Sequence, residues 1–148
     1  MPRMNIQPPR IGSGEHLLHR ASTERIRGAF YDVYNDLGFG FLEAIHARAL
    51  TMDLRSTGAH VEREVTTEVR YRGAVLAHHR MDLVVDKRIV VEIKATKRLH
   101  DEDSRQLLNY LRATEFEVGL LLHFGPRPSF RRLVSTNSVR SAGVSLPR

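Results

Sequence analysis

The chain has 148 residues and a formal net charge of +6; hydrophobic residues make up 41% of it and charged residues 27%. This length and composition predict one globular domain and exclude a largely disordered chain. The sequence shows no apolar run long enough to cross a membrane, no secretion pattern and no cysteine. Disulfides, thiolate metal sites and cysteine nucleophiles are therefore excluded, and a cytoplasmic location is expected. The positive charge favours nucleic acid as a partner.

The first part of the chain predicts an arm and two helices. Residues 1–20 contain Pro and Gly without a regular apolar pattern, which is typical of a flexible arm. Apolar residues at helical spacing predict a helix over 22–36 that ends at Gly38. A second helix is predicted from about residue 40 to residue 57. It carries an apolar stripe of Leu42, Ile45, Ala49 and Met52 beside a stripe of Glu43, His46, Ala47 and Leu50.

Three strands joined by hairpins are predicted next. Residues 60–72 alternate loosely and are partly β-branched, which predicts a strand with room for a bulge. Gly73 marks a turn into a strand over about 75–85, and the strand 89–95 follows.

A helix and two further strands complete the predicted domain, which spans residues 21–135. The helix begins at residues 101–104 and ends near residue 115, and the apolar run 118–122 predicts a fully buried strand. Residues 130–134 form a short last strand, and the acid-free segment 136–148 is expected to be a loose tail. A hairpin followed by a helical crossover predicts an α/β fold with a mixed central sheet flanked by helices.

The hairpin from Asp82 to Lys94 is unusual because charges interrupt two otherwise apolar strands. Glu92 and Lys94 lie two residues apart, so their side chains point to the same side of the strand. Charged groups inside such strands are costly to bury unless something binds them. A solvated hairpin with alternating charges is the alternative, but strands that are apolar on both faces are typical of buried ones.

The length of the turn decides whether the two acids meet. A three-residue turn over 86–88 sets Val85 opposite Ile89, and Asp82 then falls opposite Glu92 with Cβ atoms roughly 5 Å apart. A two-residue turn would put the acids on opposite faces of the hairpin. The prediction of a shared acidic site therefore requires an odd-length turn or a bulge.

Two carboxylates at that distance repel each other unless a cation or a proton lies between them. Their oxygen atoms suit hard cations such as Mg²⁺ or Mn²⁺. A metal ion held there polarises a phosphate oxygen and lowers the pKa of a bound water, and Lys94 can orient that water or stabilise charge on the phosphate. The pattern Asp82…Glu92-x-Lys94 thus predicts phosphodiester hydrolysis.

Further short motifs surround this hairpin. They are Leu37-Gly38, Gly40-Phe41-Leu42-Glu43-Ala44-Ile45-His46, and residues 71–73, 80–85, 91–95, 106–111 and 119–125. The order of helices and strands resembles the PD-(D/E)XK nuclease superfamily, in which a helix precedes three antiparallel strands that bear the acids and the lysine. Within it, the chain resembles the GxxExxY protein family from about Ser22 to Val134.

The resemblance implies a restriction-endonuclease-like core and a specific division of roles. Asp82, Glu92 and the Ile93 carbonyl would hold the metal ion, and Lys94 would be catalytic. The resemblance also places Glu43 at the site, where it would bind a second metal ion or position Lys94. Without the resemblance, the preferred interpretation of Glu43 is a surface glutamate near a helix N-terminus, favoured by the helix dipole.

The resemblance brings Gln106 to the same site from the other flanking helix. Gln106 and Tyr110 share a helix face, and a polar edge of an amphipathic helix is an equally good interpretation of that pair. His46 stands where the family name has Tyr, and Met81 stands where the superfamily name has Pro. His46 can still donate a hydrogen bond, and we expect His46 and Tyr110 to contact nucleic acid.

Other polar residues give weaker signals. His78 lies on the same side of its strand as Asp82, His79 on the opposite side, and both are expected to be structural or solvent-facing. Arginines near the C-terminal end of the domain can contact phosphates, although a solvated basic edge explains them equally well. These are Arg127, Arg131 and Arg132.

The sequence therefore predicts a nuclease that depends on Mg²⁺ or Mn²⁺ and acts on nucleic acid, DNA rather than RNA. One alternative is a nucleic-acid-binding module that keeps the fold without catalysis. Another is an assembly or regulatory module whose partner is a protein, with a homodimer or a larger complex as possible states.

Overall fold

The computed structural model describes residues 19–135. The predicted tail over 136–148 and all but two residues of the predicted arm over 1–20 lie outside this range. The elements in chain order are α1 (Arg20–Leu37), α2 (Glu43–Ser56), β1 (Val61–Tyr71), β2 (Ala74–Val85), β3 (Ile89–Lys94), α3 (Asp101–Ala113), β4 (Val118–Phe124) and β5 (Pro128–Val134).

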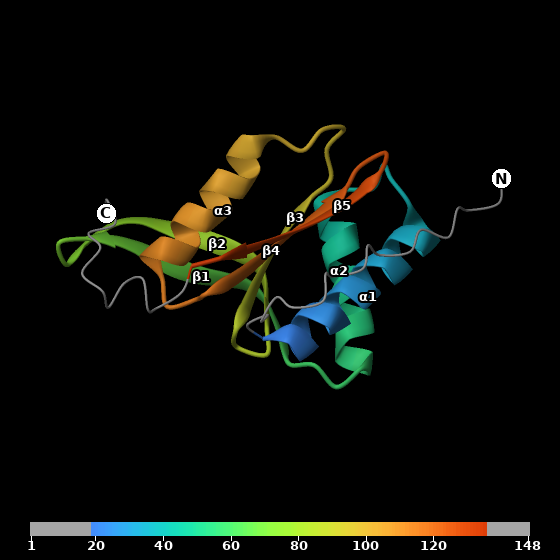
Figure 1. Ribbon diagram of the computed structural model, residues 1–148, viewed down its shortest axis with the longest axis horizontal. Coiled ribbons are helices and arrows are strands. Elements are labelled where there is room, and N and C mark those ends of the chain that lie inside the picture. The colour runs from blue at the N-terminus through green and yellow to red at the C-terminus, as the bar shows by residue number, and fades with distance from the viewer. Residues whose placement is uncertain (1–18, 136–148) are drawn as a thin grey trace.

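The five strands form one sheet in the order β1-β2-β3-β4-β5 (Figure 1). β3 and β4 run parallel and every other neighbouring pair is antiparallel. A parallel pair needs a long crossover, which α3 supplies between β3 and β4. The predicted mixed sheet flanked by helices is therefore confirmed. No helix over residues 19–135 is both long and apolar enough to span a membrane.

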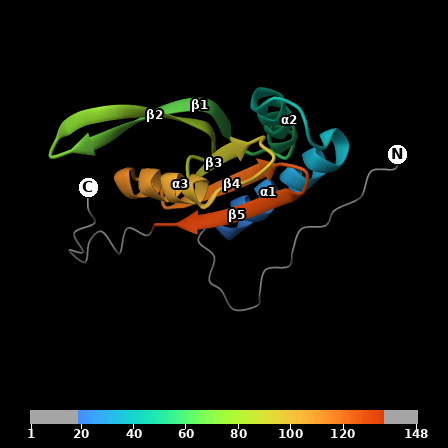
Figure 2. The same cartoon turned by 90° about the horizontal axis from the view of Figure 1, so that it is seen from above.

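The helices divide between the two faces of the sheet. α1 and α2 pack on one face, where Phe30 and Leu50 are fully buried against residues such as Leu120. α3 packs on the other face through Leu107 and Leu111. Figure 2 shows α3 apart from α1 and α2, beneath the long β1–β2 hairpin. Because both faces are covered, the central strands are apolar on both sides except at the charged positions of the β2–β3 hairpin, as their sequences predicted.

The two faces of the β1–β2 hairpin exchange near its middle. Leu83 belongs to the core beneath α1 and α2, whereas Met81, two residues away, belongs to the core beneath α3. Val61 and Val65 show the same exchange on β1. Between them, Glu64 has a left-handed backbone conformation with φ 54°. The usual alternation of side chains is interrupted there, so odd-numbered residues of β2 before Asp82 turn toward α3.

Gly119 permits the close approach of α3 to the sheet. A Cβ atom on Gly119 would lie 3.1 Å from side-chain carbons of Leu107 and Leu111. We expect Gly119→Ala to lower the free energy of unfolding by about 1–3 kcal/mol, because the added methyl overpacks this contact. Urea denaturation measures the change.

Gly28 in α1 provides the matched control, because nothing lies within 4 Å of a Cβ atom built there. Gly28→Ala should raise the free energy of unfolding by about 0.5–1 kcal/mol through helix propensity. Equal stability of Gly119→Ala and the wild-type protein would contradict the packing described for α3.

Candidate functional site

The turn between β2 and β3 has the length that the acidic site requires. Val85 pairs with Ile89 and Leu83 pairs with Val91, so residues 86–88 form a three-residue turn. Continuing this register sets Asp82 opposite Glu92. Past the last pair, the backbone N–H of Ile93 donates a hydrogen bond of 2.8 Å to Oδ2 of Asp82, which fixes that carboxylate beside β3.

The two carboxyl groups interact directly. Burial raises the pKa of Glu92 to about 8, and the charge of Asp82 and a hydrogen bond between the two side chains add to the rise, while Lys94 opposes it. Without a cation, Glu92 therefore keeps its proton at neutral pH. The pair has the character expected of an acidic site that needs either a proton or a cation.

A cavity of about 200 Å³ brings together side chains from both helical layers. Glu43 enters it from the start of α2, and Gln106 and Tyr110 enter from α3. All six residues that were predicted to be catalytic or metal-binding line this one cavity. These are Glu43, Asp82, Glu92, Ile93, Lys94 and Gln106.

The sequence also matches a family model described as the PD-(D/E)XK nuclease superfamily over residues 20–133. The chain belongs to the PD-(D/E)XK nuclease superfamily. A comparison with curated proteins found no match. Among solved structures, one described as "Crystal structure of SSO0001" is similar, with 19% identity and a TM-score of 0.49 over 86% of this chain and 74% of that chain.

PD-(D/E)XK nucleases generally use divalent metal ions, and the donor atoms at this cavity fit one. Mg²⁺ is usually held by one or two carboxylates, with waters and substrate phosphates completing its shell. Asp82 and Glu92 supply two carboxylates whose mutual repulsion a cation would relieve. Over residues 19–135 no group of three or more His, Asp or Glu side chains could hold a metal ion together. The two carboxylates can therefore take part in binding a divalent cation whose other positions stay open.

His79 lines the site of this PD-(D/E)XK protein, although the strand pattern had placed it on the opposite side of its strand from Asp82. Its Nε2 lies 3.2 Å from Oε1 of Glu92, and its ring stacks on Tyr110 with centroids 3.4 Å apart. Burial lowers the pKa of His79, although Asp82 opposes the change. His79 reaches the cavity because the hairpin faces exchange between it and Asp82, which strict alternation could not predict.

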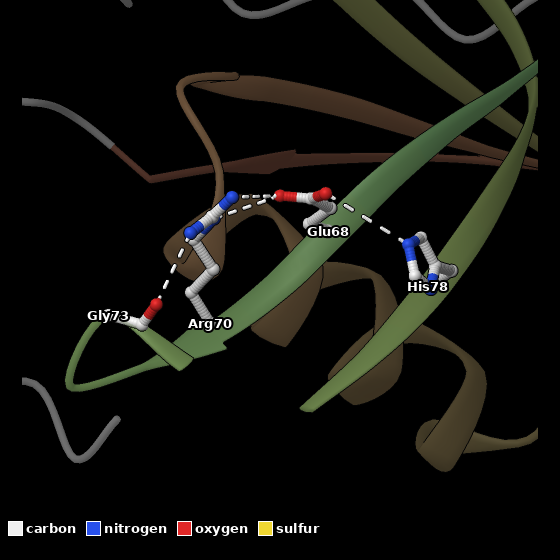
Figure 3. Close-up of polar contacts among 4 residues, drawn as sticks. All are labelled: Glu68, Arg70, Gly73 and His78. Carbon is white, nitrogen blue, oxygen red and sulfur yellow. Dashed lines mark hydrogen bonds and ion pairs between the residues drawn. The ribbon is translucent and has the colours of Figure 1, made fainter. Parts of the chain in front are cut away.

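His78 correspondingly points away from the cavity, although it was expected on the Asp82 side. Its Nε2 lies 4.0 Å from Oε1 of Glu68. Figure 3 shows His78 beside Glu68, which also binds Arg70, and Arg70 donates to the Gly73 carbonyl near the hairpin tip. His78 thus belongs to an exposed network of β1 and β2, as a solvent-facing histidine would.

The position of His46 contradicts the prediction that this residue contacts nucleic acid. Its side chain is 0% exposed, and its ring stacks on Phe124 with centroids 3.9 Å apart. Neither Nδ1 nor Nε2 of His46 has a hydrogen-bond partner among the described residues. The side chain cannot touch a bound ligand, because it packs in the core between α2 and the sheet.

Burial lowers the pKa of His46 below its ordinary value of 6.5. A depressed pKa contributes stability that is present above the ordinary pKa and is lost as the pH falls below it, because the unfolded chain takes up the proton first. We expect the contribution of His46 to the free energy of unfolding to decrease between pH 7 and pH 5, so His46→Phe should gain stability relative to the wild-type protein over this range. Urea denaturation at both pH values tests it, with His78→Phe as the exposed control; an unchanged pH dependence in His46→Phe would refute the assignment.

The three predicted phosphate-binding arginines do not line this cavity. They also do not line a second, adjoining groove that shares Asp82 with the cavity. Arg131 donates a hydrogen bond of 2.9 Å to Ser104 and lies 3.8 Å from Asp101, so it joins β5 to α3. Arg132 is its neighbour and points to the opposite face of β5, and Arg127 is exposed in the turn before that strand. They do not form one surface with the acids.

Proposed function

We propose that this chain is a metal-dependent nuclease that hydrolyses phosphodiester bonds of nucleic acid, with DNA as the expected substrate over RNA. The observation that carries the proposal is that Asp82, Glu92 and Lys94 line one cavity, with the Asp82 carboxylate held there by the backbone N–H of Ile93. The superfamily supplies the reaction class, since its members are typically nucleases.

In the proposed mechanism, Asp82, Glu92 and the Ile93 carbonyl would hold Mg²⁺ or Mn²⁺. The bound ion would polarise a phosphate oxygen and lower the pKa of a water molecule. Asp82 is pre-oriented for this role by the N–H of Ile93. The Lys94 ammonium group orients the attacking water or stabilises negative charge that builds on the phosphate.

The residues from the flanking helices complete the proposed site. The Glu43 carboxylate lies close enough to raise the pKa of Glu92, so Glu43 can position Lys94 or bind a second metal ion. Gln106 lines the same cavity and can donate a hydrogen bond to the attacking water or to a phosphate oxygen. Tyr110 holds the ring of His79 by stacking and closes the α3 side of the cavity.

We also propose a subfamily, a cellular location and an oligomeric state. The motif at residues 40–46 supports membership in the GxxExxY family, with His46 in place of the expected Tyr. A cytoplasmic location and assembly into a homodimer or a larger complex remain predictions.

Asp82→Asn tests the metal dependence of the proposed reaction. We expect wild-type protein to cleave labelled single-stranded or double-stranded DNA with Mg²⁺ or Mn²⁺, and not with EDTA. Asp82→Asn should lower the rate by about 100-fold or more, since removing a metal ligand or an electrostatic group at the reacting centre has effects of this order. Asp101→Asn is the control, because the Asp101 side chain is 96% exposed. Cleavage that persists in EDTA, or that is equal in both variants, would refute the proposal.

A second candidate is a non-catalytic nucleic-acid-binding or protein-assembly module that retains the fold. One observation favours a protein partner: Leu42 and Met52 on α2 are 75% and 72% exposed. A protein partner would cover these exposed apolar side chains. This candidate predicts binding without cleavage under any metal condition.

A further inference from the structure

A groove of about 680 Å³ adjoins the acidic cavity. The two share Glu43, Arg80, Asp82 and Ile93 in their linings, so the groove opens onto the same carboxylates. Residues 39–44 before and at the start of α2 line it, together with residues of β1, β2 and the end of β3. Whatever occupies this groove therefore lies next to the reacting centre of the proposed nuclease.

Two phenylalanines of the groove lining are exposed to solvent. Phe39 is 43% exposed and Phe41 is 44% exposed, which is unfavourable for large apolar rings in the absence of a ligand. They flank Gly40, whose φ of 112° is a backbone conformation that L side chains rarely adopt. The local sequence thus sets both rings at the groove in a specific backbone conformation.

The ring of Phe41 also packs against a buried aromatic ring, that of His46. Its edge meets the ring of His46 with centroids 6.0 Å apart and planes at 82°, and His46 stacks in turn on Phe124 in the core. Aromatic pairs in this arrangement attract each other. The buried His46 therefore positions the ring of Phe41, which remains 44% exposed.

Cations complete the lining of the groove. Arg63, Arg80 and Lys97 all line it and are exposed. Arg80 lies 3.7 Å from Glu64, an exposed pair that contributes little and can exchange its partner for a phosphate. Aromatic platforms beside cations are the combination that binds single-stranded nucleic acid, because the rings stack on bases while the cations contact the backbone.

The strandedness follows from the aromatic rings. In a duplex the base faces are already stacked on one another, so Phe39 and Phe41 would find only edges and phosphates. We propose that this groove binds unpaired nucleotides of a single-stranded nucleic acid next to the scissile phosphate, with Phe39 and Phe41 stacking on bases. This assignment rests on the proposed nuclease function and names its substrate class.

An apolar protein segment is the other occupant that exposed phenylalanines could bind. The cations and the shared acidic site favour nucleic acid, since a hydrophobic segment would leave Arg63 and Lys97 without a counterpart and would block the cavity. Leu42 and Met52 are also exposed, but Met52 lies outside the groove lining. The exposed apolar side chains are therefore not all part of this groove.

Binding by fluorescence anisotropy tests the proposal in the Lys94→Ala background, so that cleavage does not interfere. The probes are a fluorescein-labelled DNA oligonucleotide without self-complementarity and the duplex of the same sequence. Phe39→Ala and Phe41→Ala should each weaken single-strand binding by about 5- to 150-fold, the effect of losing one base–aromatic stack, and change duplex binding less than about twofold. Phe41→Tyr should keep the affinity, and Met52→Ala is the matched apolar control outside the groove. Thermal unfolding confirms that each variant is folded.

Unchanged single-strand binding in both alanine variants, or an equal loss for the strand and the duplex, overturns the proposal. A loss in Phe41→Tyr as large as in Phe41→Ala overturns stacking as its basis. Binding of neither probe also overturns it and leaves a protein segment as the occupant. If the wild-type protein cleaves nucleic acid but the phenylalanine variants bind the single strand as well as before, only the single-strand proposal is refuted. If the phenylalanine variants lose single-strand binding selectively but the wild-type protein never cleaves, only the proposed nuclease function is refuted.

Discussion

Lys94→Ala is expected to lower the rate of metal-dependent cleavage by roughly 100- to 1,000-fold without changing the unfolding temperature. Removing one group that stabilises charge at a reacting centre has effects of this size. Lys94 lines the acidic cavity and is close enough to lower the pKa of Glu92. Its ammonium group therefore lies beside the carboxylates that would hold the metal ion, where its charge acts on them.

The other lysines of the chain provide the controls for this prediction. Lys87 is exposed in the turn between β2 and β3, and Lys87→Ala should leave the cleavage rate unchanged. Lys94→Arg keeps the charge but changes its shape and should recover only part of the rate. Activity in Lys94→Ala equal to that of Lys87→Ala would show that Lys94 takes no part in the reaction.

The second large effect is on stability in the absence of metal. The folded state raises the pKa of Glu92 from 4.5 to about 8, so it binds this proton more tightly than the unfolded chain does. The stabilising contribution is complete below the ordinary pKa of 4.5 and is lost as the pH rises through about 8. With about 1.4 kcal/mol for each pH unit, the expected loss in the free energy of unfolding amounts to several kcal/mol.

Metal-free protein should therefore unfold at a lower temperature at pH 9 than at pH 5, and Glu92→Gln should remove most of this difference. The amide keeps the shape of the protonated acid and cannot ionise. Added Mg²⁺ should stabilise the wild-type protein at pH 8, because a cation relieves the same repulsion, and should stabilise Glu92→Gln much less. Thermal unfolding in EDTA and in Mg²⁺ at both pH values measures this. A pH dependence that survives in Glu92→Gln would place its origin elsewhere.

The sequence was sufficient for the elements that depend on local pattern. The odd-length turn at 86–88 was a condition that the predicted acidic site had to meet, and the register of β2 and β3 meets it. The mixed sheet followed from a hairpin, a helix and a fully apolar strand in that order. These features are encoded in residues close together in the chain.

The side of a helix or strand that faces the core was harder to predict. On α2, the stripe that includes Leu42 and Met52 is exposed, and the neighbouring stripe with His46 and Leu50 is buried. Both stripes have helical spacing, so periodicity alone could not choose between them. His79 was misplaced for a related reason, since the left-handed backbone of Glu64 has no sequence signal as glycine would have.

The cationic lining was missed because it is assembled by tertiary structure. Arg63 and Lys97 are far from Arg80 and Asp82 in the chain, and only the folded structure brings them to the same groove. The local concentration of arginine near residues 127–132 was the stronger sequence signal, yet Arg131 is used to join β5 to α3.

The central claim is that Asp82 and Glu92 hold a divalent metal ion at the reacting centre. Crystals of the protein soaked in Mn²⁺ test it most directly through anomalous scattering. We expect an anomalous peak between the carboxylates of Asp82 and Glu92, next to the Ile93 carbonyl, and its loss in crystals of Asp82→Asn. A protein that cleaves nucleic acid with Mn²⁺ but shows no peak there, or shows its peak at other residues, would contradict this assignment of the metal ligands.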